Sequence, residues 1–258
     1  MATTSLVPPQ HGAWAFLGLP LVLGALATPA SWTTPVLVVA AFTLYPASYF
    51  ALSLARARRP ARFRRPFLVW SLAAAVPSAL LVVTRPWLVW VGLAYAALFA
   101  VNLAFARRNH ERDVVNDVLL AAQAIAIVPL TWLLAAPGSR AWWPPLGEVP
   151  AEVWLLTAVC ALVLVGSTLH VKSLLRERRN PAYARASRAF AAGSGLVSLE
   201  IAVLWGLPAG LALAVPFVAL VARAFKRDWS DWRPARVGLL ELACFVLVAL
   251  GAAVALAL

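Results

Sequence analysis

Long apolar segments alternate with short polar segments along the whole chain. Nine apolar runs can be delimited, at residues 11–30, 34–54, 66–84, 86–106, 113–136, 151–171, 189–206, 208–224 and 237–258. Each is near the ~20 residues that a helix needs to cross a hydrocarbon core about 30 Å thick. Because backbone polar groups inside lipid must bond within their own segment, such spans are expected to be helices. The pattern therefore predicts an all-α, polytopic transmembrane helical bundle of about nine spans, with residues 1–258 forming a single domain.

Three of the nine runs give weaker signals than the others. Pro20 interrupts the first run, and the seventh and eighth share the tight turn at residues 205–208. No Lys or Arg precedes the first run, so it lacks the positively charged start of a secretory signal peptide. We therefore expect the first run to be retained as a span.

Basic residues are concentrated in alternate gaps between the apolar runs. The gaps after the second, fourth, sixth and eighth runs hold 20 of the 22 Lys and Arg residues when Arg223, at the very end of the eighth run, is counted with them. The intervening gaps hold only Arg85 and Arg140. Short loops rich in Lys and Arg stay on the cytoplasmic side of a membrane. The alternation therefore predicts four cytoplasmic loops, a cytoplasmic N-terminus and an external C-terminus.

Composition excludes an ordinary soluble domain. Hydrophobic residues make up 63% of the chain and charged residues 12%, against about 45–50% and about 25% in soluble domains. A net charge of +12 would suggest nucleic acid as the partner of a soluble protein. Here the basic residues are better explained as topology signals that contact anionic lipid headgroups. We therefore expect membrane lipids as partners and no nucleic acid.

A stripe of polar residues lies between the fourth and fifth runs. Asn109, Asp113 and Asp117 are four residues apart, and Asn116 lies on the same helical face. Two carboxylates and an amide supply the oxygen ligands that Mg²⁺ prefers, commonly together with substrate phosphates. Asp113, Asn116 and Asp117 are therefore candidate magnesium ligands. A second interpretation is that Asp113 caps the helix and pairs with Arg112 or Arg108.

The polar stripe can extend further into the apolar spans. Asn102 precedes Asn109 by seven residues, and Gln123 follows Asn116 by seven. Polar groups facing lipid are costly, so this stripe should face the bundle interior or a wet cavity. Glu200 is an acid inside the seventh run. Because ionisable residues within a membrane span are usually functional, Glu200 is a candidate functional residue.

A second polar segment follows the sixth run. His170 lies at the membrane boundary, and Lys172 and Arg176 form a basic face beside it. A histidine can move protons and basic groups can neutralise phosphate, whereas the alternative is a snorkelling helix end that contacts lipid phosphate. The candidates for proton transfer are His11 and His170. The candidates for binding a phosphorylated substrate are Asn109, Arg112, Lys172 and Arg176.

Three separated motifs carry a family resemblance. They are Pro-Gln-His-Gly-Ala-Trp at 9–14, Arg-Asn-His-Glu-Arg-Asp-Val-Val-Asn-Asp at 108–117 and His-Val-Lys-Ser-Leu-Leu-Arg-Glu-Arg at 170–178. Together they resemble the signatures of the YwiC-like family of bacterial integral membrane proteins. The resemblance covers most of the chain and implies a location in the bacterial plasma membrane, but no particular activity.

A weaker resemblance is to the UbiA prenyltransferase superfamily. Those proteins have nine transmembrane helices and two Asp-rich cytoplasmic motifs that hold Mg²⁺ and a prenyl diphosphate. The nine runs and the Asn116-Asp117 pair are similar here. However, no further aspartates follow Asp117 in the expected register, and the second segment has Glu177 in place of an Asp pair. The resemblance therefore supports a UbiA-like helical bundle as a hypothesis for the fold, but it does not support prenyl transfer as the activity.

Three functions are compatible with these patterns. The leading hypothesis is a Mg²⁺-dependent enzyme that acts at the cytoplasmic face on a lipid-soluble phosphorylated substrate, such as a prenyl diphosphate or a phospholipid-like molecule. The alternatives are a transporter or permease for a small solute or ion, and a membrane assembly or scaffold protein. An enzyme should gather its polar stripes in a pocket closed toward the outside, whereas a transporter should continue them past the midplane.

Overall fold

Helices account for all regular structure in the described part of the chain. The computed structural model describes residues 5–9, 11–108, 110, 113–136, 141–226 and 233–258, without the side chain of His11. The helices are α1 (His11–Leu26), α2 (Thr33–Arg56), α3 (Ala61–Thr84), α4 (Leu88–Arg107), α5 (Val114–Ile125), α6 (Ile127–Ala135), the 3-10 turn η1 (Leu146–Glu148), α7 (Ala151–Val171), the π-helical turn η2 (Lys172–Arg176), α8 (Pro181–Trp205), α9 (Ala209–Phe225) and α10 (Pro234–Ala257). The all-α fold predicted from the apolar pattern is therefore confirmed.

The predicted spans correspond to helices of two lengths. Within the described residues, seven segments are long and apolar enough to cross a membrane, with α5 and α6 forming one and α7 and η2 another. The remaining apolar helices, α1 and α9, are shorter. Both belong to the runs that gave the weaker sequence signals. The protein is thus a multi-pass membrane protein, whereas its assignment to one domain stays a prediction.

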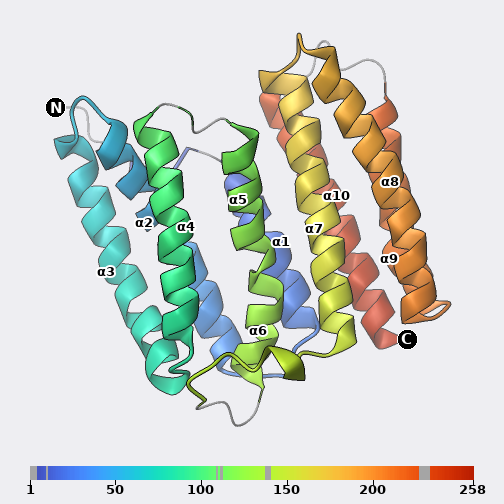
Figure 1. Cartoon of the computed structure of the whole chain (residues 1–258), viewed down its shortest axis with the longest axis horizontal. Helices are drawn as coiled ribbons and strands as arrows, with labels where there is room; N and C mark the ends of the chain where they lie inside the picture. Colours follow the sequence, from blue (N-terminus) through green and yellow to red (C-terminus); the bar gives the residue numbers. More distant parts are fainter. Residues whose placement is uncertain (1–4, 10, 109, 111–112, 137–140, 227–232) are drawn as a thin grey trace.

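The bundle is arranged around α1, α5 and α7. Figure 1 shows α2, α3 and α4 at one side and α8, α9 and α10 at the other. Helix α1 packs against α6, α7 and α10, and α7 also packs against α5 and α8. The fully buried side chains of Leu23, Leu134, Leu156 and Leu164 fill this centre. Residues from both ends of the sequence therefore meet along α7.

The basic segments lie at one end of the bundle. In Figure 1 the α2–α3, α4–α5 and α7–α8 connections lie at the upper end, as do the end of α9 and the start of α10. The α1–α2, α3–α4, α6–α7 and α8–α9 connections and the C-terminus lie at the lower end. The geometry therefore agrees with the charge alternation, which requires the basic segments to share one side.

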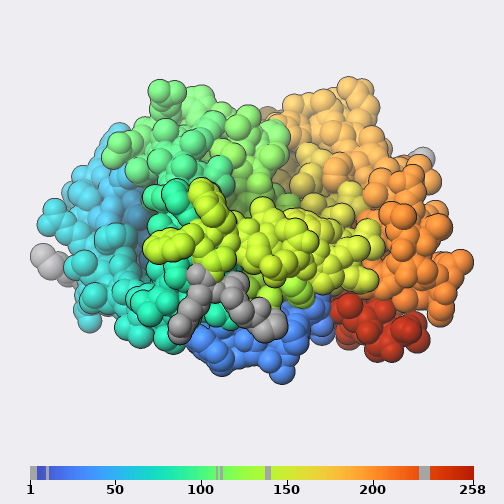
Figure 2. All heavy atoms as spheres, turned by 60° about the horizontal axis from the view of Figure 1, so that its bottom comes forward, coloured from blue at the N-terminus to red at the C-terminus, as the bar shows by residue number. Residues whose placement is uncertain are grey.

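Residues 141–150, which lead into α7, run across the lower end of the bundle, as Figure 2 shows. Trp143 stacks on Trp90 with ring centroids 4.8 Å apart, and the Trp90 indole N–H donates to the carbonyl of Trp142 at 2.8 Å. Trp142 and Trp143 are also strongly exposed. Exposed tryptophans at the end of a span are typical of the membrane–water interface.

The predicted span at residues 113–136 contains a break between α5 and α6. Pro129 has no N–H to donate to the carbonyl of Ile125, and its ring disfavours a regular helix at that point. Just before the break, the backbone carbonyl of Gln123 accepts a hydrogen bond from the Tyr95 hydroxyl at 2.5 Å. The break thus lies beside a polar contact with α4.

The end of α7 widens into η2. The N–H of Glu177 donates to the carbonyl of Lys172 at 2.8 Å, five residues back. Such π-helical turns are rare and are often found at functional sites. Lys172 begins this turn with a helical backbone, and its own N–H still bonds to the carbonyl of Thr168 on α7.

Candidate functional site

An ion pair joins α5 to the end of α7. The Lys172 Nζ lies 2.6 Å from the Asp117 Oδ2, and the two side chains are 5% and 14% exposed. The ammonium group also lies 5.8 Å from the centre of the Tyr183 ring on α8. A predicted metal ligand and a predicted phosphate ligand, 55 residues apart in the sequence, are therefore direct partners.

Asp113 takes a different partner. Its Oδ2 lies 3.1 Å from the His110 Nδ1, and both side chains are at least half exposed. Asp113 has the extended backbone of an N-cap residue before α5, but its side chain makes no capping hydrogen bond. The cap interpretation is therefore correct for its backbone position only, and among the described residues its ionic partner is a histidine instead of an arginine.

The remaining residues of the predicted metal and phosphate sites are placed differently. Asn116 is buried at the start of α5, whereas Arg176 is exposed at the end of η2. Asn109, Arg112 and the side chain of His11 lie outside the described residues. The predicted set therefore does not form one buried site within the described part of the chain.

The described residues contain no group of three or more His, Cys, Asp or Glu side chains that could hold a metal ion. Asp113 and Asp117 lie one helical turn apart, but each carboxylate is engaged by a basic or imidazole group. A cation that binds either carboxylate would have to compete with these contacts. Magnesium binding at Asp113, Asn116 and Asp117 stays a prediction.

The polar stripe continues from this ion pair into the membrane. The Asn102 amide donates from Nδ2 to the Gln123 Oε1 at 3.2 Å, and Asn102 is buried between α4 and α5. The contact of Tyr95 with Gln123 extends the same polar region toward the middle of α4. The expectation that Asn102 and Gln123 face the bundle interior therefore agrees with the structure.

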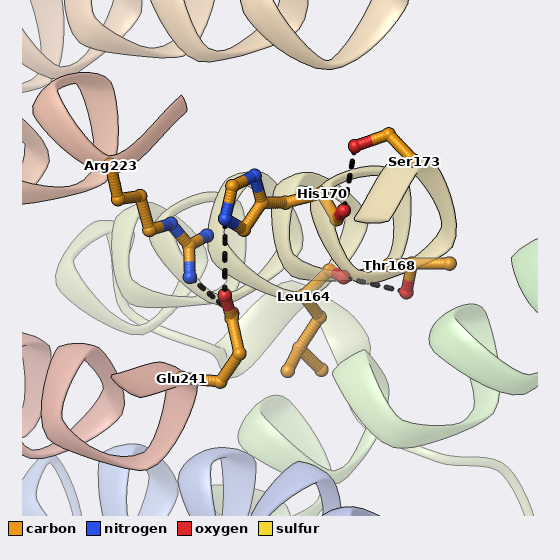
Figure 3. A network of polar contacts seen from close by, with 6 residues as sticks. All are labelled: Leu164, Thr168, His170, Ser173, Arg223 and Glu241. Carbon is orange, nitrogen blue, oxygen red and sulfur yellow. Dashed lines mark hydrogen bonds and ion pairs between the residues drawn. The ribbon is translucent and has the colours of Figure 1, made fainter. Parts of the chain in front are cut away.

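A second and more deeply buried cluster lies between α7, α9 and α10. Figure 3 shows Arg223 and His170 directed at the carboxylate of Glu241. Arg223 forms an ion pair with Glu241 through Nη1 and Oε2, and the His170 Nε2 lies 4.0 Å from the Glu241 Oε1. The side chains of His170, Arg223 and Glu241 are 3%, 6% and 7% exposed. Three ionisable groups thus meet inside the bundle.

A small cavity of about 10 Å³ adjoins this cluster. Its polar lining comes from His170, Ser187, Ser194 and Arg223, and Gly166 leaves room on the α7 side. Ser187 and Ser194 are buried residues of α8. The volume is close to the minimum that a single water molecule requires.

Sequence reasoning identified His170 but missed its two partners. From the sequence, Arg223 counts only among the basic residues at the end of the eighth run, and Glu241 lies near the start of the ninth run. In the structure both are buried, on α9 and α10 respectively. Both residues lie inside apolar runs, and a charged residue in such a run could have indicated a buried partner.

Because polar side chains at membrane depth are expected to find one another or water, the sequence predicts that His11, Asp117 and His170 line one cavity near the cytoplasmic face. The described residues test only the part that concerns Asp117 and His170. Asp117 binds Lys172, whereas His170, two residues earlier on α7, contacts Glu241. Positions two apart on a helix do not face each other, so the two polar clusters lie on different sides of α7. Glu200 belongs to neither cluster, because it is exposed on α8.

Comparisons with known proteins identify the family. The model for "YwiC-like protein" matches residues 7–132. The "Uncharacterized protein YwiC" of Bacillus subtilis (strain 168) is 32% identical over 94% of this chain and 95% of its own length. An uncharacterized protein of Haemophilus influenzae is 28% identical over 92% of this chain and 93% of its own. No solved structure matches the chain, so the weaker resemblance to the UbiA superfamily stays a prediction. The chain, a multi-pass helical membrane protein, belongs to the YwiC-like family.

Proposed function

We propose that this protein is a transporter or permease for a small solute or ion, and that protons bind at the cluster of His170, Arg223 and Glu241. The observation that carries the proposal is the meeting of three buried ionisable side chains from α7, α9 and α10. Ionisable residues inside a membrane are costly and commonly mark proton or substrate paths. A bundle that needed only packing at this point would be served by apolar side chains.

The geometry suits proton binding because two protonatable groups are neighbours. The Glu241 carboxylate lies 4.0 Å from the His170 imidazole, while Arg223 keeps a permanent positive charge beside it. A proton on Glu241 would neutralise the acid and weaken its attraction to Arg223. Because the three groups belong to different helices, this change would alter the forces between α7, α9 and α10.

The helix breaks are consistent with a protein that changes conformation. α5 and α6 are separated at Ala126, and α7 passes into a π-helical turn at Lys172. Transporters commonly place polar groups beside discontinuous helices. Here Gln123 lies beside the first break and the Lys172–Asp117 ion pair lies at the second.

Proton entry into vesicles tests the proposal. The purified protein would be reconstituted with an internal pH-sensitive dye, with KCl on both sides and valinomycin to dissipate any membrane potential. An external acid pulse should acidify wild-type vesicles faster than protein-free vesicles. Glu241→Gln should reduce the rate to that of protein-free vesicles, because the amide cannot take up the proton.

Glu152→Gln is the matched control, because Glu152 is an exposed acid at the opposite end of the bundle, at the start of α7. It should acidify at the wild-type rate. Size-exclusion profiles of all variants would verify that each remains folded. Equal rates in wild-type and protein-free vesicles would refute the proposal.

We further propose that the basic end of the bundle faces the cytoplasm of a bacterial cell and that the protein lies in the plasma membrane. Reporter fusions at residues 60 and 180 should then give cytoplasmic signals, and a fusion at residue 143 an external one. The reason is that basic short loops resist translocation. An external signal at residue 60 or 180 would reverse the orientation.

A second candidate function is an enzyme that acts on a lipid-soluble phosphorylated substrate. The observation that favours it is an open surface groove of about 850 Å³ at residues 175–181, lined by Arg176, Arg178 and Arg179. Arginine suits phosphate groups because its guanidinium can donate two parallel hydrogen bonds. Lys172, which forms the ion pair with Asp117, begins the turn that leads to this groove.

Magnesium titration separates this candidate from the transporter. In detergent, Mg²⁺ alone should stabilise the protein little, because Asp113 and Asp117 are already engaged. Mg²⁺ together with a prenyl diphosphate should raise the melting temperature if phosphate draws Lys172 away from Asp117. Asp117→Asn should abolish this joint effect, and Glu148→Gln, at the other end of the bundle, should preserve it. An unchanged response in Asp117→Asn would exclude these residues as the metal site.

A further inference from the structure

The cavity beside the buried cluster is lined by polar groups that can donate hydrogen bonds. Ser187 is 4% exposed, and its hydroxyl has no hydrogen-bond partner among the described residues. Arg223 is also buried, and its Nε likewise has no acceptor among them. Both residues line the cavity. Buried donors without acceptors are costly, so this lining favours a ligand that accepts hydrogen bonds.

The size of the cavity limits what it can hold. A volume of about 10 Å³ leaves room for a single water-sized group. A chloride ion is larger than a water molecule, so it fits only when side chains of the lining move apart slightly. Gly166 and Ala191 bound the space on α7 and α8, so a bulky ligand would force these helices apart. The site therefore suits a monatomic anion better than an organic solute.

We propose that this cavity binds a small inorganic anion of halide size, and that the anion binds together with a proton on Glu241. This inference rests on the proposed function and names the class of its substrate. When Glu241 is ionised, it neutralises Arg223. When Glu241 takes up a proton, Arg223 loses its counter-ion, and an anion in the adjoining cavity can replace it.

Charge balance explains why the two ligands would bind together. Moving an unpaired charge into the bundle costs several kcal/mol, so a protonated Glu241 with no anion leaves Arg223 uncompensated. An anion bound beside an ionised Glu241 would add an uncompensated negative charge. One proton and one anion together leave the net charge of the cluster unchanged, so joint binding avoids both costs.

The surroundings of Glu241 contain no other charge that could replace the anion among the described side chains. Arg223 approaches it from α9 and His170 from α7. Helix α1 also packs against α10, and its residues 12–26 include no ionisable side chain.

Exchange of the anion in the vesicle assay tests the inference. The acid pulse would be repeated with potassium gluconate replacing KCl on both sides, because gluconate is too large for the cavity. Wild-type protein should acidify the vesicles in chloride and fall to the protein-free rate in gluconate. Equal proton entry in both salts would overturn anion binding and leave the transporter proposal intact. No proton entry in either salt would overturn both.

Binding can also be measured without transport. At pH 5.5, chloride should raise the melting temperature of the detergent-solubilised protein relative to equal gluconate, and the effect should shrink at pH 8. Ser187→Ala should raise the half-maximal chloride concentration by roughly tenfold, the expected loss of one hydrogen bond to a charged group. Ser198→Ala is the matched control, because Ser198 is buried on the same helix, does not line the cavity and bonds to the Gly195 carbonyl. An equal chloride response in wild type and Ser187→Ala would contradict the site.

Discussion

Replacing Arg223 by methionine should lower the free energy of unfolding by about 3–5 kcal/mol, the usual cost of removing one partner of a buried ion pair. Methionine keeps much of the side-chain volume but leaves the buried Glu241 without its counter-ion. Reversible unfolding in mixed detergent micelles would measure the loss. Arg188→Met is the control, because Arg188 is exposed on α8, and its effect should stay within about 0.5 kcal/mol.

The double variant separates charge from packing. Adding Glu241→Gln to Arg223→Met removes the unpaired acid and should recover more than half of the lost stability. If Arg223→Met instead unfolds no more easily than Arg188→Met, the buried ion pair makes no contribution to stability. In that case the charge argument for joint proton and anion binding would also lose its basis.

Gly210→Ala should destabilise the hairpin of α8 and α9 by about 3 kcal/mol, the upper end of the usual cost of overpacking. A Cβ at this position would lie 2.1 Å from the carbonyl oxygen of Ala202 and 2.3 Å from its Cα. Both atoms belong to the backbone of α8, so no side-chain rotation can relieve the clash. The hairpin also needs glycine at Gly206, whose φ of 97° is unfavourable for other residues.

Gly238→Ala provides the comparison on α10. A Cβ there meets nothing within 4 Å, and Gly238 is exposed. Alanine in a helix interior is favoured over glycine by roughly 0.5–1 kcal/mol, so this variant should unfold no more easily than wild type. Thermal unfolding of the two variants in the same detergent would reveal the difference. Equal melting temperatures would mean that α8 and α9 can separate without cost.

The local sequence predicted the elements because membrane spans are governed by local rules. About 20 consecutive apolar residues predict a span, and the intervening basic residues predict which loops share a side. The two runs that became the shorter helices, α1 and α9, were already distinguished by Pro20 and by the turn at residues 205–208. The break between α5 and α6 could also have been anticipated from Pro129.

The candidate site was less predictable, because its members come from different parts of the chain. Helical spacing correctly suggested that Asn102 and Gln123 share a polar region. Spacing also favoured a common metal site for Asp113 and Asp117, but tertiary contacts gave them separate partners, His110 and Lys172. Periodicity describes which side chains share a face of one helix, and it contains no information about the groups on the neighbouring helix.

The sequence by itself determined that this protein is a helical, multi-pass membrane protein with its basic segments on one side. Those properties follow from the transfer of single segments between water and lipid, which depends on local composition. Only the tertiary structure decided that Arg223 and Glu241 join His170 in a buried cluster, with Ser187 lining the cavity beside it. The physical reason is that a charge inside the membrane must find a partner, and packing between helices decides which partner lies within reach.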